Sequence, residues 1–253
     1  MGARGLVSWI VLLAACTTAQ AAEHGVKALS PERLALNPGE LSIGISQDWQ
    51  HPLPEVQRAV IVIHGRLRNA QTYLHSAQQA AAQAGVLSTT LIIAPQFLNE
   101  RDNTRHRLPD AVLRWQGNDW MGGQPAISPA PISSYAALDQ ILNQLNDRTR
   151  FPALREVVIA GHSGGAQVVQ RYALTTRADK ALQADGIKVR YVIANPSSYA
   201  WLTKQRPVAT FDAATCPGFN TCKYGLNDLP AYDKKKKHHQ LEASYVERDV
   251  TYL

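Results

Sequence analysis

Residues 161–165, with the sequence Gly-His-Ser-Gly-Gly, form the segment of this chain whose residue types and spacing are best suited to chemistry. They match the G-x-S-x-G pattern, in which a serine occupies a tight turn between a strand and a helix. The apolar residues 157–160 precede the turn, and the helix-forming residues 166–170 follow it. Such a turn exposes the serine hydroxyl in front of a helix N-terminus. Ser163 is therefore predicted to be a catalytic nucleophile, with a purely structural tight turn as the alternative.

The two outer glycines of this segment have a steric reason to be glycine. Gly161 and Gly165 lie on either side of Ser163, where the strand and the helix cross closely. A side chain at either position would crowd that crossing, so both are predicted to be the glycines that permit the turn.

An earlier strand ends at His64-Gly65, which predicts the second part of a hydrolytic site. Backbone N–H groups at this place can join the one that follows the serine, and together they stabilise the oxyanion of a tetrahedral intermediate. The predicted donors are Gly65, Arg66 and Gly164. His64 is interpreted as a residue that positions this loop. His162 is a poor base for Ser163, because adjacent side chains in such a turn point apart.

The segments that must position these residues alternate between strand-like and helix-like patterns. The predicted strands are residues 58–63, 88–94, 155–160, 189–194 and 248–253. The predicted helices are residues 69–84, 134–147 and 165–176. Continuous apolar runs rich in β-branched residues are typical of parallel strands that are buried on both faces. The expected fold class is therefore α/β, a mostly parallel sheet covered by helices on both faces, in one domain over 58–253 that follows an N-terminal segment, 16–57.

Residues 99–131 interrupt this alternation, with Trp115 and Trp120 among several glycines and prolines. The segment leaves the carboxyl end of the second predicted strand, where open α/β sheets place their ligand crevices. The two tryptophans are expected either to line a substrate pocket or to pack within a surface loop.

The N-terminus has the pattern of an export signal. Residues 1–15 contain an apolar run that is too short to span a bilayer, and they are predicted to be a signal peptide. Residues 13–16 match a bacterial lipobox, which predicts lipidation of Cys16. Ordinary cleavage after Ala21 is the alternative. In both cases we expect an exported protein, on the periplasmic side of the cell envelope with a lipid anchor, or secreted.

The two remaining cysteines, Cys216 and Cys222, flank a turn-rich segment. In an exported protein they are expected to form a disulfide, with two reduced thiols as the alternative. A metal site is not expected, because the two sulfurs have neither a histidine nor a second cysteine pair nearby.

Composition excludes several classes of protein. With 253 residues, 45% apolar and 18% charged, the chain is neither disordered nor fibrous nor a disulfide-rich miniprotein. Its net charge is +6, but the lysines at 234–237 supply four of those charges. The basic character is therefore local, and nucleic-acid binding is not expected.

Several segments together resemble the α/β-hydrolase superfamily, and more narrowly a group of exported bacterial and fungal proteins of undefined substrate. They are residues 63–65, 68–70, 94–97, 161–165, 195–199 and 223–226. The resemblance implies a serine hydrolase with a Ser–acid–His triad that cleaves a carboxylic ester through an acyl-enzyme. It also implies a small-molecule or polymeric ester as substrate and no metal or organic cofactor. A lipid anchor would be the only membrane contact.

The resemblance fails at the acid and the base of the triad. In the superfamily both follow the serine, near the last two strands of the sheet. Residues 250–253 read as the start of the penultimate strand, so the chain as given is expected to lack its C-terminal strands and these two residues. His238 and His239 follow Ser163, but the adjacent lysines lower imidazole basicity, and we interpret that run as a solvated loop. The alternative function is a catalytically inactive or truncated binding protein of the cell envelope.

Overall fold

The computed structural model describes residues 24–208, 214–233 and 238–253. The predicted signal peptide, 1–15, lies outside these ranges, together with Cys16, Ala21 and the lysine run 234–237. Among the helices in the described ranges, none is both long and apolar enough to cross a bilayer.

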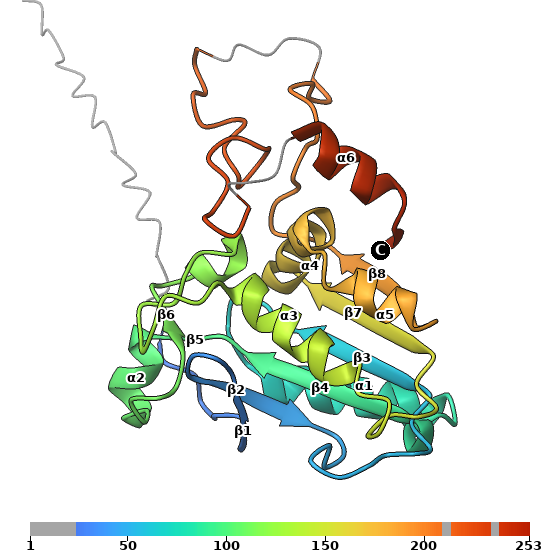
Figure 1. The fold of residues 1–253 in the computed structure, drawn as a ribbon. Coiled ribbons are helices and arrows are strands. Elements are labelled where there is room, and N and C mark those ends of the chain that lie inside the picture. The colour runs from blue at the N-terminus through green and yellow to red at the C-terminus, as the bar shows by residue number, and fades with distance from the viewer. Residues whose placement is uncertain (1–23, 209–213, 234–237) are drawn as a thin grey trace, which may run out of the picture.

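A seven-stranded sheet with the order β1-β2-β4-β3-β7-β8-β9 forms the centre of the molecule (Figure 1). Its strands are β1 (Glu32–Ala35), β2 (Glu40–Ile45), β3 (Arg58–Ile63), β4 (Thr90–Gln96), β7 (Glu156–His162), β8 (Lys188–Ala194) and β9 (Asp249–Tyr252). The five strands from β4 to β9 are parallel to one another, and β1 and β2 run antiparallel at one edge. The predicted mostly parallel sheet is confirmed, and its five parallel strands are the five that the sequence predicted.

The antiparallel edge strands were not predicted. β1 and β2 are short and lie in a largely polar segment, and a turn at Gly39 with a φ of 89° joins them. β2 is held by its pairing with β4, in which Ser42 lies opposite Gln96. These strands therefore depend on a long-range contact that a local sequence pattern does not reveal.

Six α-helices lie in the described ranges. They are α1 (Ala70–Gln83), α2 (Glu100–His106), α3 (Ser134–Leu145), α4 (Gly164–Thr175), α5 (Asp179–Ala184) and α6 (His238–Val246). α1, α3 and α4 match the predicted helices, whereas α2, α5 and α6 are additional. α6 corrects the interpretation of its first residues as a solvated loop.

The alternation of side chains along β3 shows that helices cover both faces of the sheet. Ala59, Ile61 and Ile63 are buried in the main core with residues of α3 and α4. Val60 and Val62 point to the other face and pack against α1. Successive side chains of a strand point to opposite faces, so α1 lies on one side and α3 and α4 lie on the other. In Figure 1, α3 crosses in front of the sheet.

Parts of the segment 99–131 pack into the core. Trp115 and Trp120 are fully buried. Phe97 stacks on Trp120 and meets Trp115 edge to face, with 5.3 Å between ring centroids in both pairs. Of the two alternatives for these tryptophans, the structure thus favours packing within the protein.

The predicted disulfide is wrong in this structure, where Cys216 and Cys222 are free thiols. Successive turns shape the chain between them, with Phe219 N–H donating to the Cys216 carbonyl and Thr221 N–H to that of Gly218. Cys216 is exposed, whereas Cys222 lies in a cavity wall beside Arg171. The two side chains therefore meet different environments.

Candidate functional site

Ser163 lies between the end of β7 and the start of α4, at the carboxyl edge of the parallel strands. Its backbone has φ 57° and ψ −119°, a conformation that costs energy for a residue with a side chain. The Ser163 N–H donates to the Ala194 carbonyl at 3.1 Å, and its carbonyl accepts from Ser197 N–H at 3.1 Å. The strained turn is therefore held by the loop that follows β8. It leaves Ser163 partly exposed.

The outer glycines of the turn are in backbone-to-backbone contact. A Cβ atom at Gly165 would lie 2.1 Å from the Ile63 carbonyl oxygen. A Cβ atom at Gly161 would lie 2.4 Å from the Gly165 carbonyl carbon. Neither contact can be relieved by a side-chain rotation, because both partners are main-chain atoms. The crossing of β3, β7 and α4 therefore requires glycine at both positions.

The three predicted oxyanion donors lie together beside Ser163. A Cβ atom at Gly65 would be 3.7 Å from Ser163 Cβ, and one at Gly164 would be 3.2 Å from the Arg66 backbone nitrogen. The turn after β3 thus packs against the N-terminus of α4. The backbone of Gly65 and Arg66 therefore lies close to Ser163 and Gly164.

His64 holds the peptide group between Gly65 and Arg66. Phe97 N–H donates to His64 Nε2 at 3.0 Å, so we assign the ring proton to Nδ1, which lies 2.8 Å from the Gly65 carbonyl oxygen. A carbonyl and the following N–H point in opposite directions across one peptide plane. By fixing the Gly65 carbonyl, His64 therefore also fixes the direction of the Arg66 N–H.

His64 is buried and neutral. Desolvation by burial, with a smaller effect of nearby Arg68, lowers its pKa from 6.5 to about 4. The sequence interpretation of His64 as a positioning residue agrees with these contacts, since a buried neutral imidazole with both nitrogens engaged has no free lone pair for Ser163.

We expect this histidine to make the fold sensitive to acid. Below pH 6.5 the unfolded chain protonates His64, whereas the folded protein does not until about pH 4. Stability should therefore fall as the pH drops through this window, by about 2 kcal/mol between pH 7 and pH 5. Urea unfolding at the two pH values measures the loss. His64→Asn lacks the titrating group and should lose about 2 kcal/mol less over the same interval; an equal loss would contradict the assignment.

A buried ion pair between Arg68 and Asp102 stabilises the turn after β3. Arg68 Nε donates to Asp102 at 2.8 Å, and both side chains are almost completely buried. Asp102 also accepts from the backbone N–H groups of Val26 and Asn99. The pair thus ties the turn after β3 to α2 and to the N-terminal segment.

The described part of the chain gives Ser163 Oγ no hydrogen-bonded base. No described side chain makes a hydrogen bond with Ser163 Oγ. The His162 side chain is exposed, and its Nδ1 lies 3.5 Å from the Tyr73 hydroxyl rather than at Ser163 Oγ. His239 is exposed on α6. The described residues also contain no cluster of three His, Cys, Asp or Glu side chains that could hold a metal ion. The structure thus brings Ser163 together with the backbone of Gly65, Arg66 and Gly164, the residues predicted to supply the nucleophile and the oxyanion donors.

Arg171, which the sequence analysis missed, ties the loop after β8 and residues 222–223 to α4. It lies on α4 and is buried, and burial lowers its pKa. Its guanidinium donates to the carbonyls of Ser198, Cys222 and Lys223 and to the Ser198 hydroxyl. A guanidinium has five N–H donors, so one side chain can hold two separate loops. The available signal was a single charged residue in the predicted helix 165–176.

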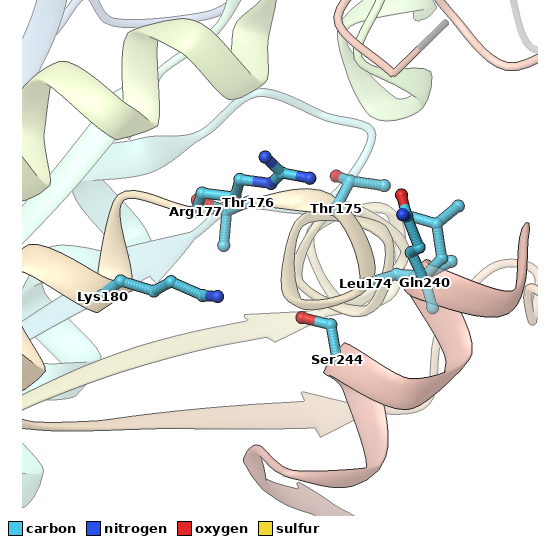
Figure 2. A pocket seen from close by; sticks show the side chains of 8 residues that line it. Leu174, Thr175, Thr176, Arg177, Lys180, Gln240 and Ser244 are labelled. Atoms are coloured by element: carbon cyan, nitrogen blue, oxygen red, sulfur yellow. The ribbon is translucent and has the colours of Figure 1, made fainter. Parts of the chain in front are cut away.

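A cavity of about 300 Å³ lies at the opposite end of α4 from Ser163. Figure 2 shows its lining side chains gathered around the last turn of the helix, with Arg177 and Lys180 on one side and Gln240 and Ser244 on the other. Since α4 is 12 residues long, this cavity is separate from the serine turn.

The strand order, the parallel register and a serine turn at the carboxyl end of β7 together define the α/β-hydrolase fold. No protein-family model matches the sequence. A comparison with curated proteins also found no match.

Solved structures resemble this fold at low sequence identity. A poly(aspartic acid) hydrolase from Sphingomonas sp. KT-1 is 19% identical, with 90% of this chain and 71% of that chain covered at a TM-score of 0.53. A poly(3-hydroxybutyrate) depolymerase from Bordetella parapertussis is 20% identical, with a TM-score of 0.47. That alignment covers 75% of this chain but 58% of the depolymerase. At these identities the likeness concerns the fold.

Proposed function

We propose that this protein is a serine hydrolase that cleaves a carboxylic ester through an acyl-enzyme, with Ser163 as the nucleophile. The observation that carries the proposal is the strained backbone of Ser163, with a φ of 57°, at the junction where the Arg66 backbone nitrogen lies against Gly164. Strain of this kind persists where the surrounding structure enforces it, and it is concentrated at active sites.

In the proposed reaction Ser163 Oγ attacks the ester carbonyl carbon while its proton passes to a base. The N–H groups of Arg66 and Gly164, with the turn at Gly65, stabilise the negative charge on the carbonyl oxygen. Collapse of the tetrahedral intermediate breaks the ester C–O bond, and the alcohol leaves with a proton. Water then adds to the acyl-enzyme, and the carboxylic acid departs as Ser163 regains its hydrogen.

The proposal does not assign the base to a described residue, because none contacts Ser163 Oγ. This same observation favours a second candidate function, a catalytically inactive binding protein with the α/β-hydrolase fold. Serine without a base is a weak nucleophile, which is why the two candidates differ in reactivity.

Labelling with a fluorophosphonate probe separates the two functions. The protein should be taken as its native host produces it. We expect covalent labelling, with the modified peptide carrying the probe on Ser163. Absence of labelling in the folded protein would favour the inactive candidate.

Two further parts of the proposal concern the substrate and the location of the protein. We propose a small-molecule or polymeric ester as substrate, and from the poly(aspartic acid) hydrolase we carry over only that a hydrolase can have this fold. We propose export, with lipidation at Cys16, from the sequence pattern of residues 1–21 alone.

A further inference from the structure

The described residues 199–208 and 214–224, which lie between β8 and α6, include exposed side chains that are aromatic or basic. Figure 1 shows this segment, in orange, standing off the sheet beyond α4. We define the 199–224 surface by six exposed residues, which are Tyr199, Trp201, Lys204, Val208, Lys223 and Tyr224. Its four apolar or aromatic members have exposed fractions of 46% for Tyr199, 37% for Trp201, 56% for Val208 and 41% for Tyr224.

Contacts within the segment bring Trp201, Lys223 and Tyr224 together around Arg206. Trp201 N–H donates to the Tyr224 carbonyl at 3.1 Å. The Arg206 guanidinium lies over the rings of Trp201 and Phe219, at 5.5 and 5.2 Å from their centroids, and also donates to the Tyr224 carbonyl. The Lys223 ammonium lies 5.1 Å from the centroid of the Tyr224 ring. The cations and the rings therefore alternate at close range.

The segment 199–228 is net basic, with Lys204, Arg206 and Lys223 against Asp228 and against Asp212, which lies outside the described residues. The described residues 199–208 and 214–227 contain Lys204, Arg206 and Lys223 and no Asp or Glu. In the described residues no ion pair involves Lys204 or Lys223. The surface is therefore complementary to an anionic partner.

The apolar members decide between a soluble polyanion and a lipid surface. Phosphates of a soluble polymer satisfy the cations but leave Trp201, Val208 and Tyr224 in water. Tryptophan and tyrosine favour the boundary between headgroups and acyl chains, where the ring is buried and the polar edge stays wet. Basic residues next to them add attraction to anionic headgroups.

We propose that the 199–224 surface docks on an anionic lipid surface, with the rings at the headgroup level and Lys204 and Lys223 against the lipid phosphates. This docking is independent of catalysis at Ser163, since it requires binding and no turnover. It is connected to the site through the loop after β8, where Ser197 N–H donates to the Ser163 carbonyl.

Vesicle binding tests the proposal. The full chain should carry Cys16→Ser, so that an acyl group does not contribute. We expect it to sediment with phosphatidylcholine vesicles containing 30% phosphatidylglycerol, and much less with phosphatidylcholine alone. Trp49, Trp115 and Trp120 are buried, and the tested chain should also carry Trp9→Phe because Trp9 lies in the apolar N-terminal run. A shift of tryptophan emission to shorter wavelength should then come from Trp201 and should vanish in Trp201→Phe.

Charge variants provide a matched comparison, because all of them share the same N-terminus. Each basic residue near an anionic surface is worth a factor of about five in affinity. Lys204→Gln with Lys223→Gln should therefore weaken vesicle binding about 30-fold. Lys27→Gln with Lys188→Gln removes the same charge elsewhere and should change binding less than about threefold. Equal losses in the two pairs would overturn the proposal. An equal emission shift with soluble polyglutamate would also overturn the proposal, because it would indicate a site for soluble polyanions.

Discussion

Replacing Ser163 with alanine should reduce ester hydrolysis by a factor on the order of 10³ or more and abolish fluorophosphonate labelling. The variant removes the attacking oxygen, while the oxyanion donors at Arg66 and Gly164 stay in place. Substrate binding should therefore survive the loss of turnover. Steady-state kinetics on a p-nitrophenyl ester, together with the unfolding curve, measure both consequences.

Ser76→Ala is the matched control, because it makes the same substitution at an exposed position of α1. We expect unchanged kinetics from this variant. Equal rates for wild type and Ser163→Ala would remove Ser163 from the mechanism. If neither protein hydrolysed the ester, and wild type took up no probe, the inactive binding function would replace the enzyme.

Gly165→Ala should destabilise the fold by about 3 kcal/mol, the largest effect on stability that we expect from a single methyl group. The added Cβ would lie 2.1 Å from the Ile63 carbonyl oxygen and 2.7 Å from that of His64. Relief requires α4 to move away from β3, which opens the core beneath the serine turn. Urea unfolding should show a lower midpoint with an unchanged slope.

Gly218→Ala makes the same chemical change where no atom lies within 4 Å of the new Cβ. Its free energy of unfolding should stay within about 0.5 kcal/mol of wild type. The comparison isolates steric crowding from the lower flexibility of alanine in the unfolded chain. An equal loss of unfolding free energy in the two variants would contradict the close contact between Gly165 and the end of β3.

The sequence by itself determined the parallel part of the sheet and the place of the serine turn. β3, β4 and β7 contain continuous apolar runs, which are typical of strands covered on both faces, so their pattern is readable without knowing the neighbours. The motif around Ser163 is equally local, because the turn needs small residues at fixed spacing along the chain.

Only the tertiary structure decided the features that depend on partners far away in sequence. β2 exists through its pairing with β4, and Trp120 is buried because Phe97 and His64 pack against it. Cys216 and Cys222 are free thiols, and the backbone at Cys222 is held by Arg171, a contact that no spacing rule includes. Long-range packing chooses among conformations that are locally equivalent, and for that reason these features could not be predicted from the sequence.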